Sequence, residues 1–378
     1  MHSGGPEAGP ASALRALLVR AQHSTELEGL PEDLPAEGFL WVGVVRPAFE
    51  ERLPSLQAAL HRWGCGPLVD LHVSDLLNAQ LPSHFEDTSW YDLLVFRRLA
   101  SGSARQDAQP DAPVTMAAVR STLSAIDTSP VGFAVFDRVL LTVHPADCSV
   151  RDHFAQRLAR LGAPGAATGE IRAATRAPTS PADLMLRMVN HMVDSYLDLR
   201  RLLSRHLAAL EQQLLDPRSR FRDWPALLES RNALQSLEDT CEDQRAAVQE
   251  WIDALAQWPA ESDEAARRER ELLRVRSRDV LEHIERVLTH VRRLGQSAET
   301  AVQMHFSALS HRTNDIMRTL TVLTAIFLPL NLITGFFGMN FDALPLIHSA
   351  AGVWVALLAM AAVGAGLFAF FRRKRYLG

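Results

Sequence analysis

The stretch NDIMRTLTVLTAIFLPLNLITGFFGMNFDALP, residues 314–345, decides the architecture of this 378-residue chain. Within it, residues 320–337 carry no charge, and an α-helix of about that length crosses ~30 Å of hydrocarbon. A second uncharged apolar run covers residues 350–371. Because a helix in a soluble core is seldom apolar on every face, the two runs predict a hairpin of membrane-spanning helices.

Basic residues flank the two spans and predict their orientation. Arg312 and Arg318 surround the start of the first span, and residues 372–375, RRKR, follow the second. The connecting residues 340–349 contain no Lys or Arg. The positive-inside rule therefore predicts a multi-pass protein of the cell inner membrane, in contact with its lipid, with both termini in the cytoplasm.

The rest of the chain predicts an α+β membrane protein with a cytoplasmic α/β domain and a long helical stalk. The predicted parts, in chain order, are a disordered N-terminus (1–36), a cytoplasmic α/β domain (37–162), a linker (163–179), antiparallel cytoplasmic helices (180–259), a stalk helix that continues into the first span (262–337), an external loop (338–349), the second span (350–371) and a basic cytoplasmic tail (372–378).

Short-range patterns predict the elements of the soluble half. Strands are expected at 39–45, 91–96, 131–136 and 139–143, and helices at 49–63 with Pro54 as a break, at 73–79 and at 150–161. Ser180-Pro181-Ala182-Asp183 is a typical helix start, from which one helix is expected to run to Leu215. No phosphate loop, dinucleotide fingerprint or nucleophile elbow occurs, so we expect no enzyme. The net charge of -5 gives no reason to expect nucleic-acid binding.

The stalk carries a repeating apolar seam. Its members step by four and three in turn, namely Val280, Ile284, Val287, Val291, Leu294, Ala298 and Ala301. A single helix cannot bury such a seam, and one hairpin cannot enclose a pore. The sequence therefore predicts a homo-oligomer.

Five residues are candidates for lining an ion pathway: Asn314, Leu320, Leu328, Asn331 and Asn340. At about 100° per residue, the middle three lie within about 80° of one another, on one helical face. Asn314 lies about 120° from Leu320, so both reach one axis only if the helix tilts or bends. The alternatives are lipid or helix packing for the leucines and a helix C-cap for Asn340.

The triplet Gly338-Met339-Asn340, after Phe337 and before Phe341-Asp342, resembles the signature of the CorA family of divalent-cation channels. The resemblance implies a homopentamer that conducts Mg²⁺ or Co²⁺ and is gated by cytoplasmic Mg²⁺. It implies a selectivity filter at the triplet. It assigns Asn314 to the inner mouth, Leu320 and Leu328 to an apolar gate, and Asn331 to a polar ring where the family more often has Thr.

The same resemblance assigns Asp279 to a regulatory Mg²⁺ site between subunits. The alternative is an ion pair of Asp279 with Arg276 or Arg286. The partner acid is open, with Asp107 and Asp111 as guesses, and Gln303 stands where some members have a second stalk acid. Outside the membrane, Asp342 is the one acid of the loop, because Leu346 stands where the family often has another.

Two other functions stay open. A Zn²⁺ carrier similar to the ZntB group, with or without proton coupling, is favoured by four stalk histidines, at positions 283, 290, 305 and 311. A membrane-anchored scaffold or sensor that does not transport is favoured by the missing acids. We expect no cofactor apart from the transported and regulatory Mg²⁺, Co²⁺ or Zn²⁺.

Overall fold

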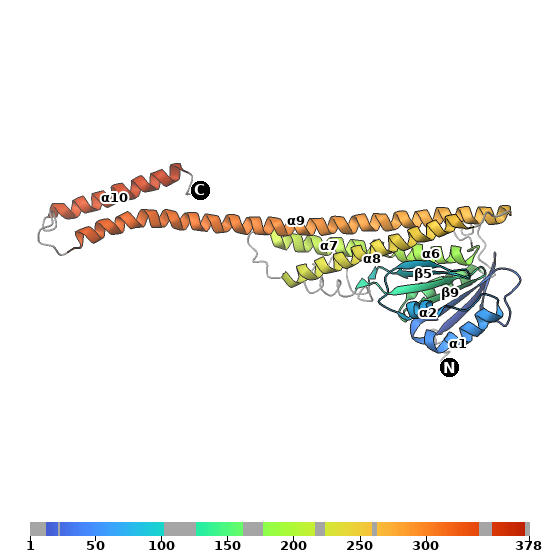
Figure 1. The fold of residues 1–378 in the computed structure, drawn as a ribbon. Helices are drawn as coiled ribbons and strands as arrows, with labels where there is room; N and C mark the ends of the chain where they lie inside the picture. Colours follow the sequence, from blue (N-terminus) through green and yellow to red (C-terminus); the bar gives the residue numbers. More distant parts are fainter. Residues whose placement is uncertain are drawn as a thin grey trace, which may run out of the picture. The chain divides into compact units, whose positions relative to one another are not determined.

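The computed structural model describes residues 13–21, 23–101, 126–161, 177–215, 224–258, 263–339 and 350–374 (Figure 1). The chain divides into two compact units, Met1–Ala298 and Glu299–Gly378. The first unit holds a mixed sheet with helices on both of its faces. The second holds the end of one long helix and one further helix.

The main sheet has seven strands in the order β2-β1-β3-β9-β8-β5-β4. Their bounds are β1 Leu14–Val19, β2 Ser24–Leu27, β3 Phe39–Val45, β4 His84–Asp87, β5 Asp92–Arg97, β8 Pro130–Val135 and β9 Val139–His144. Strands β3 and β9 pair in parallel, with Leu40 opposite Val139, and every other neighbouring pair is antiparallel. A separate two-stranded ribbon joins β6 Ala100–Ser101 to β7 Ile126–Asp127.

Both faces of this sheet are covered, so its central strands are buried along their whole length and mostly apolar, with Thr142 and His144 of β9 as buried polar residues. All residues of β8 and β9 are buried. Helices α1 Arg46–Arg62 and α2 Asp70–Leu77 share one core with alternate residues of β3, such as Leu40 and Val42. Phe39 and Trp41, which point the other way, belong to the second core.

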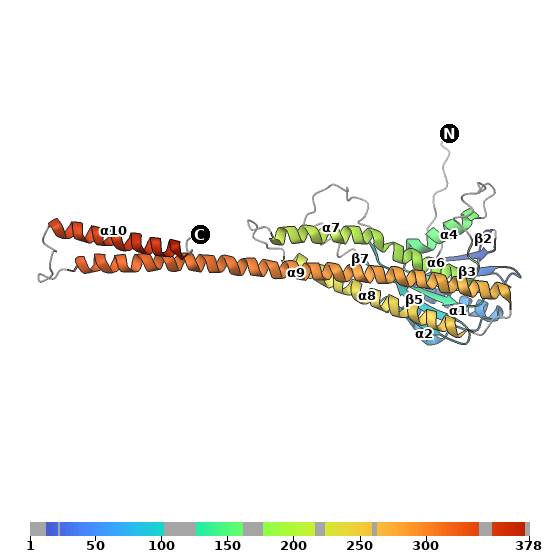
Figure 2. The ribbon, with the colours of Figure 1, turned by 90° about the horizontal axis from the view of Figure 1, so that it is seen from above.

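The second core is formed with the helices that follow the sheet. These are α4 Ser149–Leu161, α6 Pro181–Asp194, α7 Tyr196–Leu215, α8 Trp224–Gln257 and the beginning of α9, which spans Glu264–Phe337. In both views, α6, α7 and α8 lie beside the part of α9 that belongs to the first unit (Figures 1 and 2). The Ser180 side chain caps α6 by accepting a hydrogen bond from the Asp183 N–H at 3.3 Å, as the sequence predicts.

Three expectations about local structure are wrong. Residues 14–19 and 24–27, placed in a disordered N-terminus, form β1 and β2, because β1 pairs along its whole length with the buried β3. Pro54 does not break α1, since Phe49, Leu56 and Leu60 anchor both halves of that helix in the core. The helix expected from Ser180 to Leu215 is interrupted at Ser195, whose hydroxyl donates to the Met192 carbonyl at 2.6 Å and to the Leu99 carbonyl at 2.9 Å.

The seam of α9 is covered by the chain itself. Val280, Ile284 and Val291 are at most 1% exposed and share the second core with Leu203 of α7 and Leu237 of α8. The expectation that this part of the seam requires neighbouring copies is therefore wrong. The sequence pattern shows that the seam must be buried, but it cannot show which helix buries it.

Among the described residues, two helices that reach into the second unit are long and apolar enough to cross a membrane. One is the distal part of α9, and the other is α10, Ala350–Arg373. Their most apolar 18-residue windows have mean hydropathies of 1.9 and 2.3, and within this chain those windows are 6% and 0% buried. The apolar side chains of these two windows are exposed in the single chain. Lipid or another protein must therefore cover them, because apolar surface is unfavourable in water.

Candidate ion pathway and regulatory residues

The four predicted pathway residues that the structure describes lie on α9 and are exposed in the single chain. They are Asn314, Leu320, Leu328 and Asn331. Leu320 is 57% exposed and Leu328 is 70% exposed, so neither is held in a core of its own chain. Asn340 and Asp342 lie outside the described residues. The structure therefore leaves the predicted gate and polar ring free to face a neighbour, a pore or lipid.

The threonines within this apolar stretch bond to their own helix. The hydroxyls of Thr321, Thr324 and Thr334 donate to the carbonyls of Met317, Leu320 and Asn331, at 2.7, 2.9 and 3.0 Å. Such bonds satisfy hydroxyl groups where no water is available. The stretch can thus enter hydrocarbon although it carries several threonines.

The signature triplet begins where α9 ends. The Gly338 N–H donates to the Thr334 carbonyl at 2.9 Å, and a Cβ on Gly338 would lie 3.0 Å from that oxygen. A larger residue would push this carbonyl back by a few tenths of an ångström. The missing side chain of Gly338 therefore permits this close approach at the end of the helix. The next residue, Met339, is 41% exposed.

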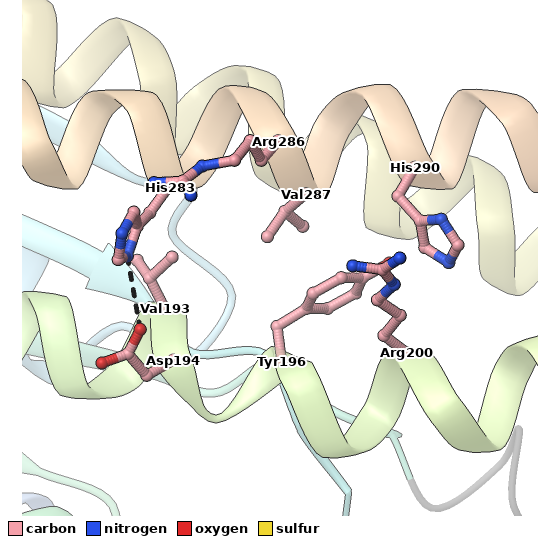
Figure 3. Close-up of a pocket in the computed structure, with 8 residues that line it drawn as sticks. All are labelled: Val193, Asp194, Tyr196, Arg200, His283, Arg286, Val287 and His290. Atoms are coloured by element: carbon pink, nitrogen blue, oxygen red, sulfur yellow. Dashed lines mark ion pairs between the residues drawn. The ribbon is translucent and has the colours of Figure 1, made fainter.

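Asp279 lies on α9 with 59% of its side chain exposed. His283 lies beside it on the same helix, with Nε2 3.7 Å from Oδ1 of Asp279, and His283 Nδ1 lies 3.3 Å from Oδ1 of Asp194 (Figure 3). The alternative pairing with Arg276 is wrong, because Arg276 binds Asp183 at 2.6 Å. The Nε of Arg286 donates to the Glu282 carbonyl at 3.3 Å. Asp279 thus keeps an accessible carboxylate.

A cavity of about 170 Å³ lies beside this pair, between α9 and the junction of α6 with α7. Figure 3 shows its lining, which comprises Val193, Asp194, Tyr196, Arg200, His283, Arg286, Val287 and His290. Burial, together with Arg200 and Arg293, lowers the pKa of His290. With two arginines and a single carboxylate, the cavity does not suit a divalent cation. Any regulatory cation would contact Asp279 outside it.

The guesses for the partner of Asp279, Asp107 and Asp111, lie outside the described residues. Sequence analysis missed a different group of metal-ligating side chains, formed by Asp75, His84 and Glu86. The signal was present, since His84 and Glu86 alternate along a short strand and therefore point to the same face. The helix that carries Asp75 could not be placed on that face from the sequence.

Comparisons of the sequence and of the structure with known proteins both find CorA proteins. The family model described as CorA-like Mg²⁺ transporter protein matches residues 73–373. The cobalt/magnesium transport protein CorA of Thermotoga maritima is 30% identical over 100 residues, which are 26% of this chain and 28% of that protein. This alignment thus spans little more than a quarter of that relative.

Two solved structures share the fold over nearly the whole chain. The complete structure of the CorA magnesium transporter from Methanocaldococcus jannaschii has a TM-score of 0.65 and 17% identity, covering 96% of this chain and 98% of that one. The structure of the full-length CmaX protein has a TM-score of 0.61 and 17% identity, covering 98% and 100%. At this identity the likeness concerns the fold alone.

Proposed function

The chain belongs to the CorA-like Mg²⁺ transporter protein family, and from that premise we propose that it is a channel for Mg²⁺ or Co²⁺ in the inner membrane. Both termini then lie in the cytoplasm, and no enzymatic role is expected. The observation that carries the proposal is the distal part of α9, uncharged from residue 320 to the Gly338 turn and almost wholly exposed in the single chain.

The proposed pathway follows the face of α9 that bears Leu320, Leu328 and Asn331. Mg²⁺ gives up its waters reluctantly, so a pore should first hold the hydrated ion. A ring of Asn340 amide oxygens can accept hydrogen bonds from those waters without binding the metal tightly. Below it, rings of Leu328 and Leu320 form an apolar constriction that closes by losing its water.

Two helices per chain cannot surround a pore, so the proposal requires several copies, five by resemblance to the family. The apolar seam of α9 around Val280 and Ile284 is not an argument for assembly, because other helices of the same chain bury it. The support comes from the exposed apolar residues of the second unit, including Phe327, Leu332 and Trp354, at 58%, 74% and 69% exposure. Neighbouring copies and lipid would share that surface.

We assign Asp279 to regulation by cytoplasmic Mg²⁺. Its carboxylate is accessible, and Asp183 holds the arginine that could have neutralised it. A Mg²⁺ ion between Asp279 and a neighbouring copy would hold the closed arrangement. At low cytoplasmic Mg²⁺ this ion would dissociate, and the channel would then be free to open.

Flux through reconstituted vesicles tests the proposal. Purified protein in liposomes is given Mg²⁺, Co²⁺ or Zn²⁺ under a membrane potential, with and without a pH gradient. Asn340→Ala is expected to abolish Mg²⁺ uptake while the oligomer stays intact, and Asn78→Ala, the same change in the first unit, is expected to transport normally. Full transport by Asn340→Ala would contradict the proposal. Zn²⁺ flux that requires the pH gradient would favour a ZntB-like carrier, and no flux of any cation would favour a scaffold.

A further inference from the structure

A cluster of metal-ligating side chains lies in the first unit, on elements other than the helices of the proposed pathway. One ligand atom each of Asp75, His84 and Glu86 lies within 4.8 Å of the others. Asp75 and His84 are half-buried, and Glu86 is exposed. The cluster is therefore open to ions from solvent while two of its members are held by the fold.

The fold brings these residues together from two elements. In β4, Phe85 points into the second core, where its ring meets Trp251 edge-on at 5.8 Å. His84 and Glu86, on either side of it, therefore point to the opposite face of the sheet. Helix α2 covers that face through the buried Val73 and Leu76, and Asp75 lies between these two in the sequence.

The His84 ring is oriented as a metal ligand requires. Its Nδ1 lies 3.2 Å from the Pro82 carbonyl, which can only accept, so Nδ1 carries the proton. The lone pair is then on Nε2. A histidine that ligates a metal through one nitrogen and donates to a backbone carbonyl from the other is the usual arrangement.

Glu86 is positioned by a buried chain of hydrogen bonds. The Val69 N–H donates to the Tyr91 hydroxyl at 3.0 Å, that hydroxyl lies 2.7 Å from His72 Nδ1, and His72 Nε2 donates to Glu86 Oε2 at 2.8 Å. His72 is 4% exposed, so this partner is fixed by packing. Oε1 of Glu86 remains for a metal, and His72 acts as a positioning residue.

We propose that Asp75, His84 and Glu86 bind a zinc-class divalent cation. One imidazole and two carboxylates supply mixed nitrogen and oxygen ligands, which suit Zn²⁺ and Co²⁺, whereas Mg²⁺ prefers oxygen ligands and water. Ligand atoms around tetrahedral Zn²⁺ are about 3.4 Å apart, given bonds of about 2.0–2.1 Å. Small side-chain rotations close the cluster to that spacing. Water completes the coordination.

Optical titration of the metal-free full chain in detergent tests this site. Co²⁺ is added to the wild type, to Asp75→Asn and His84→Ala, and to the control Asp87→Asn, which changes an exposed acid of the same strand. The wild type and the control are expected to bind one more Co²⁺ per chain than the two variants, with d–d absorption in the visible range. Zn²⁺ should displace that ion at equal concentration, and excess Mg²⁺ should not.

His72→Gln tests the positioning role separately. The affinity for Co²⁺ is expected to fall about 10- to 100-fold while the saturated spectrum keeps its shape, as for loss of other partners of metal ligands. Unchanged affinity would assign His72 to packing alone and overturn that part of the proposal.

Equal Co²⁺ stoichiometry and spectra in the wild type, Asp75→Asn and His84→Ala would overturn the site. Displacement by Mg²⁺ as readily as by Zn²⁺ would overturn its zinc-class preference. Because flux is measured with Asn340→Ala and this site by optical titration, failure of one proposal is distinguishable from failure of the other.

Discussion

Arg276 of α9 lies 2.6 Å from the carboxylate of Asp183, which is completely buried in the first turn of α6. Arg187 contacts the same carboxylate at 3.0 Å, and the Thr179 N–H donates to it at 3.1 Å. One buried acid thus joins the start of α6 to the start of the long helix. The pair also keeps Arg276 away from Asp279, the proposed regulatory acid.

We predict that Asp183→Ala lowers the free energy of unfolding by about 3 kcal/mol or more, because it removes the buried carboxylate that Arg187 and Arg276 both bind. Asp253→Ala, which removes an exposed acid on α8, is expected to change stability by less than about 0.5 kcal/mol. Denaturant unfolding followed by tryptophan fluorescence measures both. Equal stability of the two variants would show that the buried pair contributes nothing.

Leu328→Ala is expected to raise Mg²⁺ flux severalfold at high internal Mg²⁺, because a wider ring at the proposed gate stays wet. Ile326→Ala is the matched control, since about 200° of helical rotation separates the two positions and turns Ile326 away from the proposed axis. Vesicle uptake with fluorescent indicators measures the flux. A similar increase in both variants would place the constriction elsewhere.

Asp279→Asn is expected to weaken inhibition by internal Mg²⁺ about tenfold or more, since it removes a charged oxygen ligand. The exposed Glu285 on the same helix supplies the control, Glu285→Gln, with inhibition like that of the wild type. Uptake at graded internal Mg²⁺ gives the inhibition constant. Identical constants for all three proteins would remove Asp279 from the regulatory site.

Asp92 makes stability depend on pH. Burial, with Asp87 and Asp137 nearby, raises its pKa from the ordinary 3.8 to about 6. The folded chain then holds a proton that the unfolded chain releases, so this contribution is complete below pH 3.8 and is lost as the pH rises through 6. We expect Asp92→Asn to be more stable than the wild type at pH 7.5 by about 2–3 kcal/mol, and the two to converge near pH 4.

Thermal unfolding across this pH range measures the difference between the two proteins. A constant difference from pH 4 to pH 7.5 would mean that Asp92 titrates normally in the folded chain.

The sequence by itself determined the features that depend on neighbouring residues. The uncharged run from residue 320, the exit at Gly338 and the cap at Ser180 come from local hydropathy, backbone freedom and side-chain capping. The predicted start and end of the long helix nearly coincide with Glu264 and Phe337. The triplet at residues 338–340 resembles the signature of a family whose model matches residues 73–373.

Only the tertiary structure decided which surfaces meet. The seam at Val280 and Ile284 needed a partner, and long-range packing supplied α7 and α8 of the same chain. Residues 14–19 form a strand because β3 pairs with them, and residues 24–27 form another because they pair with β1. Asp75 joined His84 and Glu86 because α2 packs over the face of the sheet to which they point. Contacts between residues distant in sequence leave no local period, so a single sequence cannot specify them.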